Sequence, residues 1–116
     1  MPKFYPAFLT YIGYRYIVYY VIINFSSKAA QAIYDGAVSK LARTIPVELH
    51  PKIRRLFDQI SAASVIADLG IPPSNHLKKL KGARSEQWSI RVNKQWRIIF
   101  EWMGDNAKNV DVVDYH

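Results

Sequence analysis

The sequence predicts a single α+β domain in which two N-terminal helices pack on a curved antiparallel sheet. Two amphipathic helical patterns come first in the chain, and three or four strand patterns with short turns between them follow. Consecutive strands with short connections pair antiparallel, and the helices then have to cover one face of the sheet. The length of 116 residues, with 50% hydrophobic and 22% charged residues, suits one globular domain with a modest core.

Residues 1–20 are interpreted as an aromatic-rich extension ahead of the domain at residues 21–116. The extension holds six of the eight tyrosines, and charged residues, prolines and a glycine interrupt it. Its apolar runs are shorter than the roughly 20 residues of a membrane-spanning helix, and it lacks the aliphatic core of a signal peptide. We therefore expect a cytoplasmic protein without a membrane partner, and Val21 is a candidate for the native start.

Residues 21–25 (VIINF) predict a first strand, because β-branched and aromatic residues favour strands. Ser26 or Ser27 is expected to cap the first helix, which carries an apolar stripe and ends near Gly36. One or two further helical turns are expected at residues 37–42.

The second helix is expected to begin at His50-Pro51, since proline is favoured in the first turn of a helix. Apolar residues recur at intervals of three and four, so one face is predicted to be buried, and the helix is expected to fade toward Gly70. Lys52 and the two arginines that follow it lie off this face and are expected to be solvated. His50 is expected to have a local structural role.

The stretch 88–100, WSIRVNKQWRIIF, predicts a β-hairpin. Apolar and polar residues alternate in its first half, as in a half-buried strand. A tight turn is expected at Asn93-Lys94, because asparagine tolerates positive φ. The apolar run at 98–100 predicts a central strand, in which Arg97 faces a surface or cleft while the large aromatic residues of the hairpin pack in the core.

Two more strands are expected beside the hairpin. A rigid non-helical connection at residues 71–75 leads into a short strand at residues 76–82. The last strand is expected at residues 109–115, after a turn at residues 103–106.

Basic residues gather in the second half of the chain. The net charge is +7, and seven lysines and arginines fall in the twenty residues 78–97, with Glu86 as the single acidic residue among them. This clustering predicts a surface that contacts the phosphates of an anionic partner such as RNA. The candidate RNA-binding residues are His76, Lys78, Lys79, Arg84, Arg91 and Lys94.

The chain has no cysteine, and its three histidines are scattered along the sequence. Without cysteine the chain can form neither a disulfide framework nor a thiol nucleophile. The histidines do not have the spacing of metal ligands. We therefore expect neither a metal nor another cofactor.

Two segments carry a family resemblance: LKGxxxxxWSIRVNxxWRIIF, from Leu80 to Phe100, and the terminal DVVDYH. They resemble those of the HigB toxins, a branch of the RelE/ParE superfamily also called the proteic killer suppression family. The resemblance extends over about residues 21–116. It implies a RelE-like, microbial-ribonuclease-type fold and a toxin of a type II toxin–antitoxin system.

The resemblance also implies an activity and partners. Such toxins are metal-independent endoribonucleases that cleave mRNA in the A site of the translating 70S ribosome, where they also contact ribosomal RNA, and a helix-turn-helix antitoxin of the HigA type neutralises them. A lysine of the LKG segment, the arginine of the second hairpin strand and the terminal Asp-Tyr-His line the family's active site. By motif position these residues are Lys81, Arg97, Asp114, Tyr115 and His116.

The chemistry expected of these residues follows from their side chains. In metal-free cleavage the 2′-oxygen of RNA attacks the phosphate, so the protein has to stabilise a phosphorane-like transition state and move protons. Arg97 suits bidentate binding of phosphate oxygens, and Lys81 adds a point charge. His116 suits a general-acid or phosphate-binding role, since histidine titrates near neutrality. Tyr115 could bind the phosphate or stack on a base, and Asp114 could orient His116.

One position departs from the family pattern. Many relatives carry a histidine three residues before the lysine, in LHPLKG, where this chain has Lys78. The nearest histidine, His76, lies two residues earlier. On a continuous strand two residues span about 6–7 Å along one face, so His76 could partly replace that group, or Lys78 could supply charge alone.

Three other functions remain compatible with the sequence. A toxin of the same fold could poison DNA gyrase without cutting RNA. The charge alone would suit a non-enzymatic nucleic-acid-binding module. The displaced histidine and the extension would suit a degenerate, inactive toxin.

Overall fold

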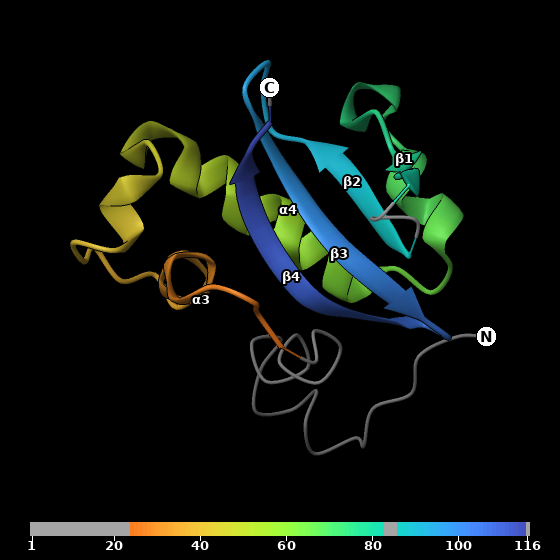
Figure 1. Ribbon diagram of the computed structural model, residues 1–116, viewed down its shortest axis with the longest axis horizontal. Helices are drawn as coiled ribbons and strands as arrows, with labels where there is room; N and C mark the ends of the chain where they lie inside the picture. Colours follow the sequence, from red (N-terminus) through yellow and green to blue (C-terminus); the bar gives the residue numbers. More distant parts are fainter. Residues whose placement is uncertain (1–23, 83–85, 116) are drawn as a thin grey trace.

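The computed structural model describes residues 24–82 and 86–115, which contain a four-stranded antiparallel sheet with helix α4 against one face (Figure 1). The strands follow the order β1-β2-β3-β4 across the sheet. The helices and strands are α3 (Lys28–Tyr34), α4 (His50–Ala62), β1 (Lys78–Lys79), β2 (Gln87–Arg91), β3 (Trp96–Met103) and β4 (Asn106–Asp114). Within these residues, 3₁₀ turns occur at Ala42–Thr44, Val47–Leu49, Ile66–Gly70 and Pro73–Asn75. The predicted α+β architecture is confirmed.

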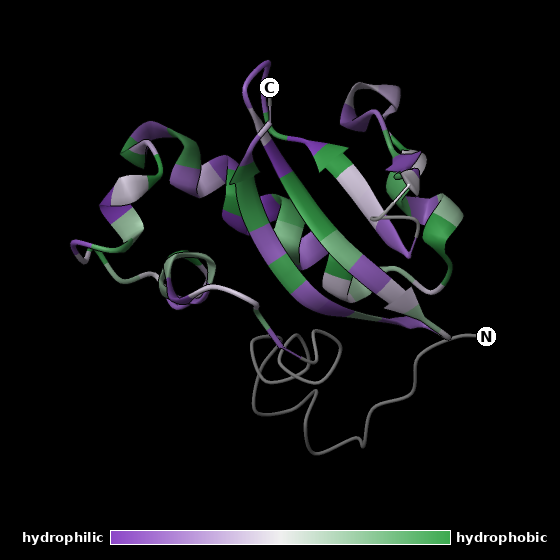
Figure 2. Cartoon of the chain, in the orientation of Figure 1, coloured by the Kyte–Doolittle hydropathy of each residue, from purple (hydrophilic) through white to green (hydrophobic). Residues whose placement is uncertain are grey.

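The alternation of side chains divides the sheet into a core face and an open face. Ile90 of β2 pairs with Ile98 of β3, which pairs with Val112 of β4, and all three side chains are buried. Phe57 and Ile60 of α4 belong to the same core. Figure 2 shows the corresponding alternation of hydrophobic and hydrophilic residues along the strands. Burial of each such side chain contributes about 1.5–3 kcal/mol, so the contact with α4 supports the whole sheet.

Strand β3 lies between β2 and β4, as its apolar run predicts. Its residues 98–100 are all buried. Phe100 is in the core, and Trp88 and Trp96 pack against it while partly exposed. The assignment of these aromatic residues to the core rather than to RNA stacking is therefore confirmed.

Helix α3 begins and ends where the sequence predicts. The Ser27 hydroxyl accepts a hydrogen bond from the Ala30 backbone N–H at 3.1 Å and donates one to Asp111 of β4 at 2.7 Å. Gly36 follows the helix with φ of +77°, a conformation that costs glycine little. In the described part of the strand expected at residues 21–25, Phe25 forms a single parallel bridge with Val110.

The helical extensions expected at residues 37–42 and beyond Ala63 are wrong. The Ser39 hydroxyl accepts from the Ala42 N–H at 3.1 Å, which starts a 3₁₀ turn instead of an earlier helix. Helix α4 ends at Ala62, and the Asp68 carboxylate accepts from the Ser64 and Val65 N–H groups at 3.0 and 3.2 Å. Short polar side chains thus satisfy backbone groups that a continued helix would have used.

The segment before β1 also differs from the prediction. The connection at residues 71–75 contains a 3₁₀ turn, Pro73–Asn75, whose first position suits proline. The strand expected at residues 76–82 is reduced to Lys78–Lys79, because His76 has the left-handed conformation, with φ of 47° and ψ of 50°. A residue in that conformation cannot continue a strand.

The hairpin loop spans residues 92–95 rather than two residues. Asn93 is not among the described residues with positive φ. Its side-chain Oδ1 instead accepts hydrogen bonds from the N–H groups of Gln95, at 2.8 Å, and Trp96, at 2.7 Å. The prediction of a turn at Asn93 is therefore confirmed. The asparagine stabilises the turn through side-chain hydrogen bonds, however, and not through a positive φ.

His50 and Lys52 both bind backbone carbonyl groups. His50 is buried, with Nε2 at 2.9 Å from the Ile45 oxygen, which confirms its structural role. Lys52 donates to the Val92 carbonyl at 2.5 Å, and Arg54 donates to that of Ile33 at 3.3 Å. Lys52 and Arg55 are exposed, as expected, whereas Arg54 is half-buried. Beyond that expectation, the bonds from Lys52 and Arg54 join α4 to the hairpin loop and to α3.

The extension at residues 1–20 lies outside the described residues. None of the helices in the described part of the chain is long and apolar enough to span a bilayer.

Candidate active site

The candidate active site lies on the open face of the sheet, opposite α4. Arg97 pairs with Arg91 of β2 and with Val113 of β4, and it alternates with the core residues Trp96 and Ile98. Its side chain therefore points away from the core, as the sequence predicts. In Figure 1 helix α4 lies behind the sheet, so this open face is turned toward the viewer.

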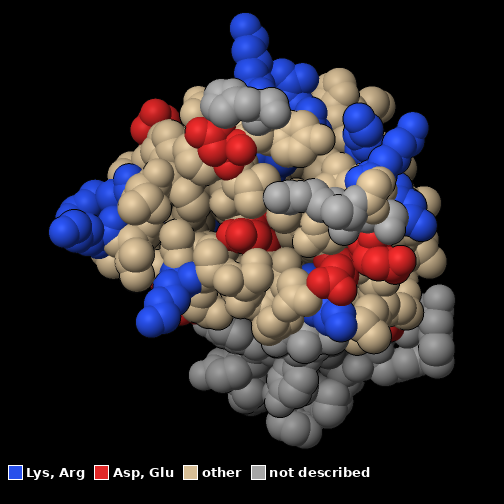
Figure 3. All heavy atoms as spheres, viewed as in Figure 1, with Lys and Arg blue, Asp and Glu red and all other residues tan. Residues whose placement is uncertain are grey.

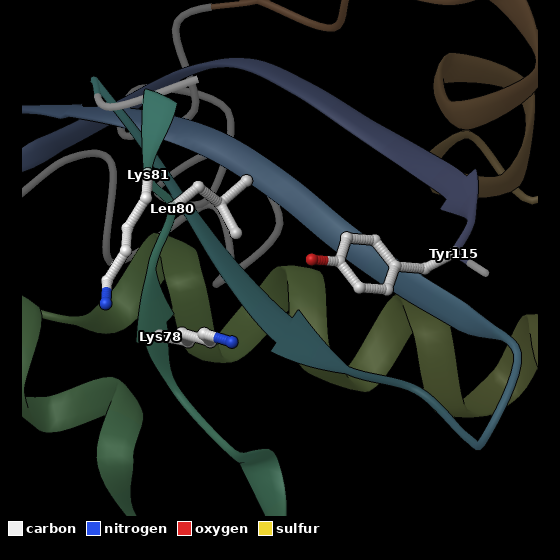
Figure 4. A pocket seen from close by; sticks show the side chains of 4 residues that line it. All are labelled: Lys78, Leu80, Lys81 and Tyr115. Carbon is white, nitrogen blue, oxygen red and sulfur yellow. The ribbon is translucent and has the colours of Figure 1, made fainter. Parts of the chain in front are cut away.

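A pocket of about 260 Å³ opens on this face, lined by Lys78, Leu80, Lys81 and Tyr115. Figure 4 shows the Tyr115 ring extending from the end of β4, with its hydroxyl directed toward Leu80 and Lys78. The Tyr115 backbone N–H donates to the Gln95 carbonyl at 2.6 Å, which fixes the chain after β4. The pocket thus joins the segment after β1 to the end of β4, two regions far apart in sequence.

Arg97 adds a guanidinium group next to this pocket. Its Cζ lies 5.0 Å from the centre of the Tyr115 ring, within the range of a cation–π contact. Its Nη1 is buried and has no hydrogen-bond partner among the described residues. Glu101, a possible ion-pair partner in sequence, is engaged instead by Lys108 at 3.9 Å and Asn109 at 2.6 Å. A buried donor without a partner costs free energy unless a ligand satisfies it.

Ser89 is a residue of this face that the sequence analysis missed. It pairs with Lys78 on one side and Ile99 on the other, and its side chain is only 1% exposed. Its hydroxyl, like the Nη1 of Arg97, has no hydrogen-bond partner among the described residues. Its position in the alternating pattern of β2 was the available signal, because it shares a face with Arg91.

The structure brings together only some of the predicted site residues. Lys78, Lys81 and Tyr115 line one pocket, and Arg97 stacks on Tyr115. A second pocket, of about 320 Å³, contains the other group: His76, Arg91 and Lys94.

Two of the described predicted residues, Lys79 and Asp114, line neither pocket. Lys79 is on the opposite face of β1, with Nζ 5.9 Å from the ring centre of Trp88. The Asp114 carboxylate accepts from Gln95 Nε2 at 3.0 Å. Arg84 and His116 lie outside the described residues.

His76 does not lie beside Lys78 on a common strand face. The left-handed conformation of His76 interrupts the extended chain, so the 6–7 Å offset expected for a continuous strand does not apply. His76 lines the second pocket and Lys78 the first. Lys78 therefore contributes positive charge to the first pocket, and no described histidine lines that pocket.

Comparison with known proteins shows to which family this chain belongs. A family model described as "RelE-like toxin of type II toxin-antitoxin system HigB" matches residues 19–116. The chain belongs to this HigB toxin family. Toxin HigB-1 of Vibrio cholerae is 36% identical over 87 residues, which cover 75% of this chain and 90% of that protein. Endoribonuclease HigB of Proteus vulgaris is 28% identical over 96 residues, which cover 83% of this chain and all of that protein.

A third relative is an uncharacterized protein of Haemophilus influenzae, 41% identical over 66 residues, which cover 57% of this chain and 65% of that protein. Membership of the HigB family confirms the resemblance seen in the sequence and the RelE-like fold expected from it. As a toxin of a type II toxin–antitoxin system, the protein has a cognate antitoxin as its partner.

Proposed function

We propose that this HigB toxin is a ribosome-dependent endoribonuclease that cleaves mRNA in the A site and thereby stops translation. One relative carries the name Endoribonuclease HigB. The observation that carries the proposal is the Arg97 guanidinium on the open face. Its buried Nη1 has no hydrogen-bond partner among the described residues, and the ring of Tyr115 lies against it. This arrangement suits a phosphate oxygen as the missing acceptor.

In the proposed reaction the 2′-oxygen of the mRNA attacks the adjacent phosphorus. The new bond joins O2′ to phosphorus and the broken bond is P–O5′, so the products carry a 2′,3′-cyclic phosphate and a 5′-hydroxyl. One proton leaves O2′ and one is delivered to O5′. Negative charge increases on the equatorial phosphate oxygens in the transition state, which is where Arg97 acts.

The lysines and the tyrosine of the pocket have separate roles in this proposal. Lys81 and Lys78 supply positive charge to the bound phosphate from the β1 side. Tyr115 holds the guanidinium from the β4 side and offers its hydroxyl or ring to the nucleotide. Proton transfer falls to His116, with Asp114 orienting it, as the family motif implies.

The open shape of the site is consistent with dependence on the ribosome. The pocket combines few side chains on a sheet face, and Lys78, Lys81 and Tyr115 are exposed. Such a site positions a flexible RNA poorly by itself, and the ribosome would supply that positioning. The cognate antitoxin in this proposal is a helix-turn-helix protein of the HigA type.

The proposal is tested by primer extension on a reporter mRNA after brief induction of the toxin. Replacing Arg97 by alanine removes the charge that stabilises the transition state, so cleavage should fall by about 10²–10³-fold. Arg55→Ala, on an exposed position of α4, is the matched control and should cleave like the wild type. Blocking translation initiation should abolish cleavage by the wild type.

Growth arrest with intact mRNA would refute the nuclease and favour a topoisomerase poison. Unchanged cleavage by Arg97→Ala would exclude Arg97 from the reaction.

A further inference from the structure

The second pocket is a site that the cleavage chemistry does not use. It forms where the start of α4, the 3₁₀ turn Pro73–Asn75 and the β2–β3 loop meet, and it has a volume of about 320 Å³. Its polar lining residues are Lys52, Ser74, His76, Arg91, Asn93 and Lys94.

The basic lining of this second pocket favours the binding of an anion. Lys52, Arg91 and Lys94 are basic side chains, His76 is a fourth basic group, and none of the described lining residues is acidic. Figure 3 shows Lys and Arg side chains gathered at the top and upper right of the open face, over the β2–β3 loop and β1. Converging like charges repel one another unless a ligand compensates them.

The walls of the second pocket are held in place by hydrogen bonds. The Asn93 side chain fixes the loop through its bonds from Gln95 and Trp96. The bond from Lys52 to the Val92 carbonyl ties the loop to α4. His76 stands at the end of its 3₁₀ turn in a left-handed conformation that costs a non-glycine residue free energy, and such outliers concentrate at functional sites.

The second pocket adjoins the candidate active site at two points. Arg91 and Arg97 are direct partners across β2 and β3, and one lines the second pocket while the other stacks on Tyr115. On the β1 side, His76 of the second pocket is followed two residues later by Lys78 of the first. Directly opposed side chains on neighbouring strands are about 5 Å apart at Cβ, so one nucleic-acid strand can contact both arginines.

We infer that the second pocket binds a backbone phosphate of the same mRNA strand, next to the phosphate that is cleaved. The inference rests on the proposed function, since it takes the RNA bound at Arg97 as the ligand. The flanking phosphate holds the strand in register but takes no part in bond breaking. Loss of this contact should therefore weaken binding of mRNA-loaded ribosomes and leave the maximal rate of cleavage unchanged.

The test compares Arg91→Gln/Lys94→Gln with Lys40→Gln/Arg43→Gln, which removes the same charge from exposed positions outside both pockets. Binding is measured to 70S ribosomes with a short mRNA in the A site and to vacant ribosomes. For programmed ribosomes we expect the pocket variant to bind about tenfold more weakly. Its slope of log affinity against log salt should be shallower by about one, while the control matches the wild type.

Single-turnover cleavage supplies the second readout. At saturating ribosomes the pocket variant should cleave at the wild-type rate. Thermal melting checks that both double variants fold. If the melting temperature of Arg91→Gln/Lys94→Gln is lower than that of the wild type, Lys94→Gln alone, at an exposed loop position, is tested in its place. We expect about threefold weaker binding for this single variant.

Each contrary result has a distinct meaning. An equal loss of binding to vacant ribosomes would place ribosomal RNA in the pocket and overturn the same-strand assignment. Unchanged binding to programmed ribosomes would mean that the pocket holds no phosphate. Absence of cleavage by the wild type would refute the proposed function, whereas the comparison of programmed with vacant ribosomes would still decide the ligand of the pocket.

Discussion

At the scale of single residues, Arg97 is defined by its neighbours. An arginine on the open face of a sheet could pair with a carboxylate, but the nearby Glu101 binds Lys108 and Asn109 instead. Tyr115 stacks on the guanidinium, and Nη1 of Arg97 is buried without a hydrogen-bond partner in the part of the chain that the structure describes. Within that part the guanidinium is oriented but not neutralised, as a phosphate-binding group should be.

This view predicts that charge alone will not replace Arg97. Arg97→Lys keeps the positive charge but loses the planar fork and the stacking on Tyr115. Cleavage in a single-turnover assay should fall about 10–100-fold, the value of one to two charge-assisted hydrogen bonds. Arg55→Lys is the control on α4. Full activity of Arg97→Lys would show that the guanidinium acts only as a point charge.

Ser89 allows a separate prediction about stability. Its buried hydroxyl has no hydrogen-bond partner in residues 24–82 and 86–115, and such a group costs about 1–3 kcal/mol. Ser89→Ala should therefore raise the free energy of unfolding by about 1 kcal/mol and increase the melting temperature by a few degrees. The exposed Ser74→Ala should change neither. A lower melting temperature for Ser89→Ala would indicate that a bound water satisfies the hydroxyl in solution.

At the scale of elements, the β2–β3 hairpin connects the two pockets. It carries Arg97 to the first pocket and Arg91 and Lys94 to the second. Its loop is held by the Asn93 side chain and by Lys52 from α4. The relative positions of the two pockets therefore depend on the β2–β3 loop, whose backbone N–H groups are bound by the Asn93 side chain.

Replacing Asn93 by alanine should loosen this loop. Two backbone N–H groups lose their acceptor, and by analogy with helix caps the loss of stability is about 0.5–2 kcal/mol. Chemical denaturation should show this loss with an unchanged m-value. Lys94→Ala, at the exposed neighbouring position, should stay within about 0.5 kcal/mol of the wild type. Equal stabilities of the two variants would mean that the Asn93 bonds do not hold the loop.

At the scale of the whole molecule, the two faces of the sheet have different tasks. One face is closed by α4 and contains the core, while the other carries the first pocket and Arg97, whose Nη1 has no hydrogen-bond partner among the described residues. The protein as a whole has a net charge of +7. Attraction to a polyanion is then a property of the entire surface, to which the two pockets add local contacts.

Binding to the ribosome should consequently depend strongly on salt. With three or more phosphate contacts, the affinity should fall about tenfold or more between 50 and 200 mM monovalent salt. Equilibrium binding to 70S ribosomes over a salt series measures the slope. An affinity independent of salt would contradict binding through phosphates.

The sequence predicts strands β2, β3 and β4, the outward direction of Arg97 and the turn at Asn93. These features depend on the period of two along a strand and on local turn chemistry, so neighbouring residues are sufficient to predict them. The Ser27 cap and the end of α3 at Gly36 are local in the same way. The resemblance to the HigB family additionally predicts that Lys81 and Tyr115 lie in one site with Arg97.

Which basic residues share a pocket depends on how distant segments of the chain pack together. The left-handed conformation of His76 separates it from Lys78, and no pattern of apolar residues signals that change. The exposed Lys52 also binds the Val92 carbonyl of the hairpin loop, a contact between segments 40 residues apart in the chain. Whether the Ser89 hydroxyl and the Arg97 Nη1 find a hydrogen-bond partner among the described residues depends on the side chains that surround them. Contacts between distant segments depend on the register of the strands and on the backbone angles of single residues such as His76. Both are determined by the packing of the whole chain.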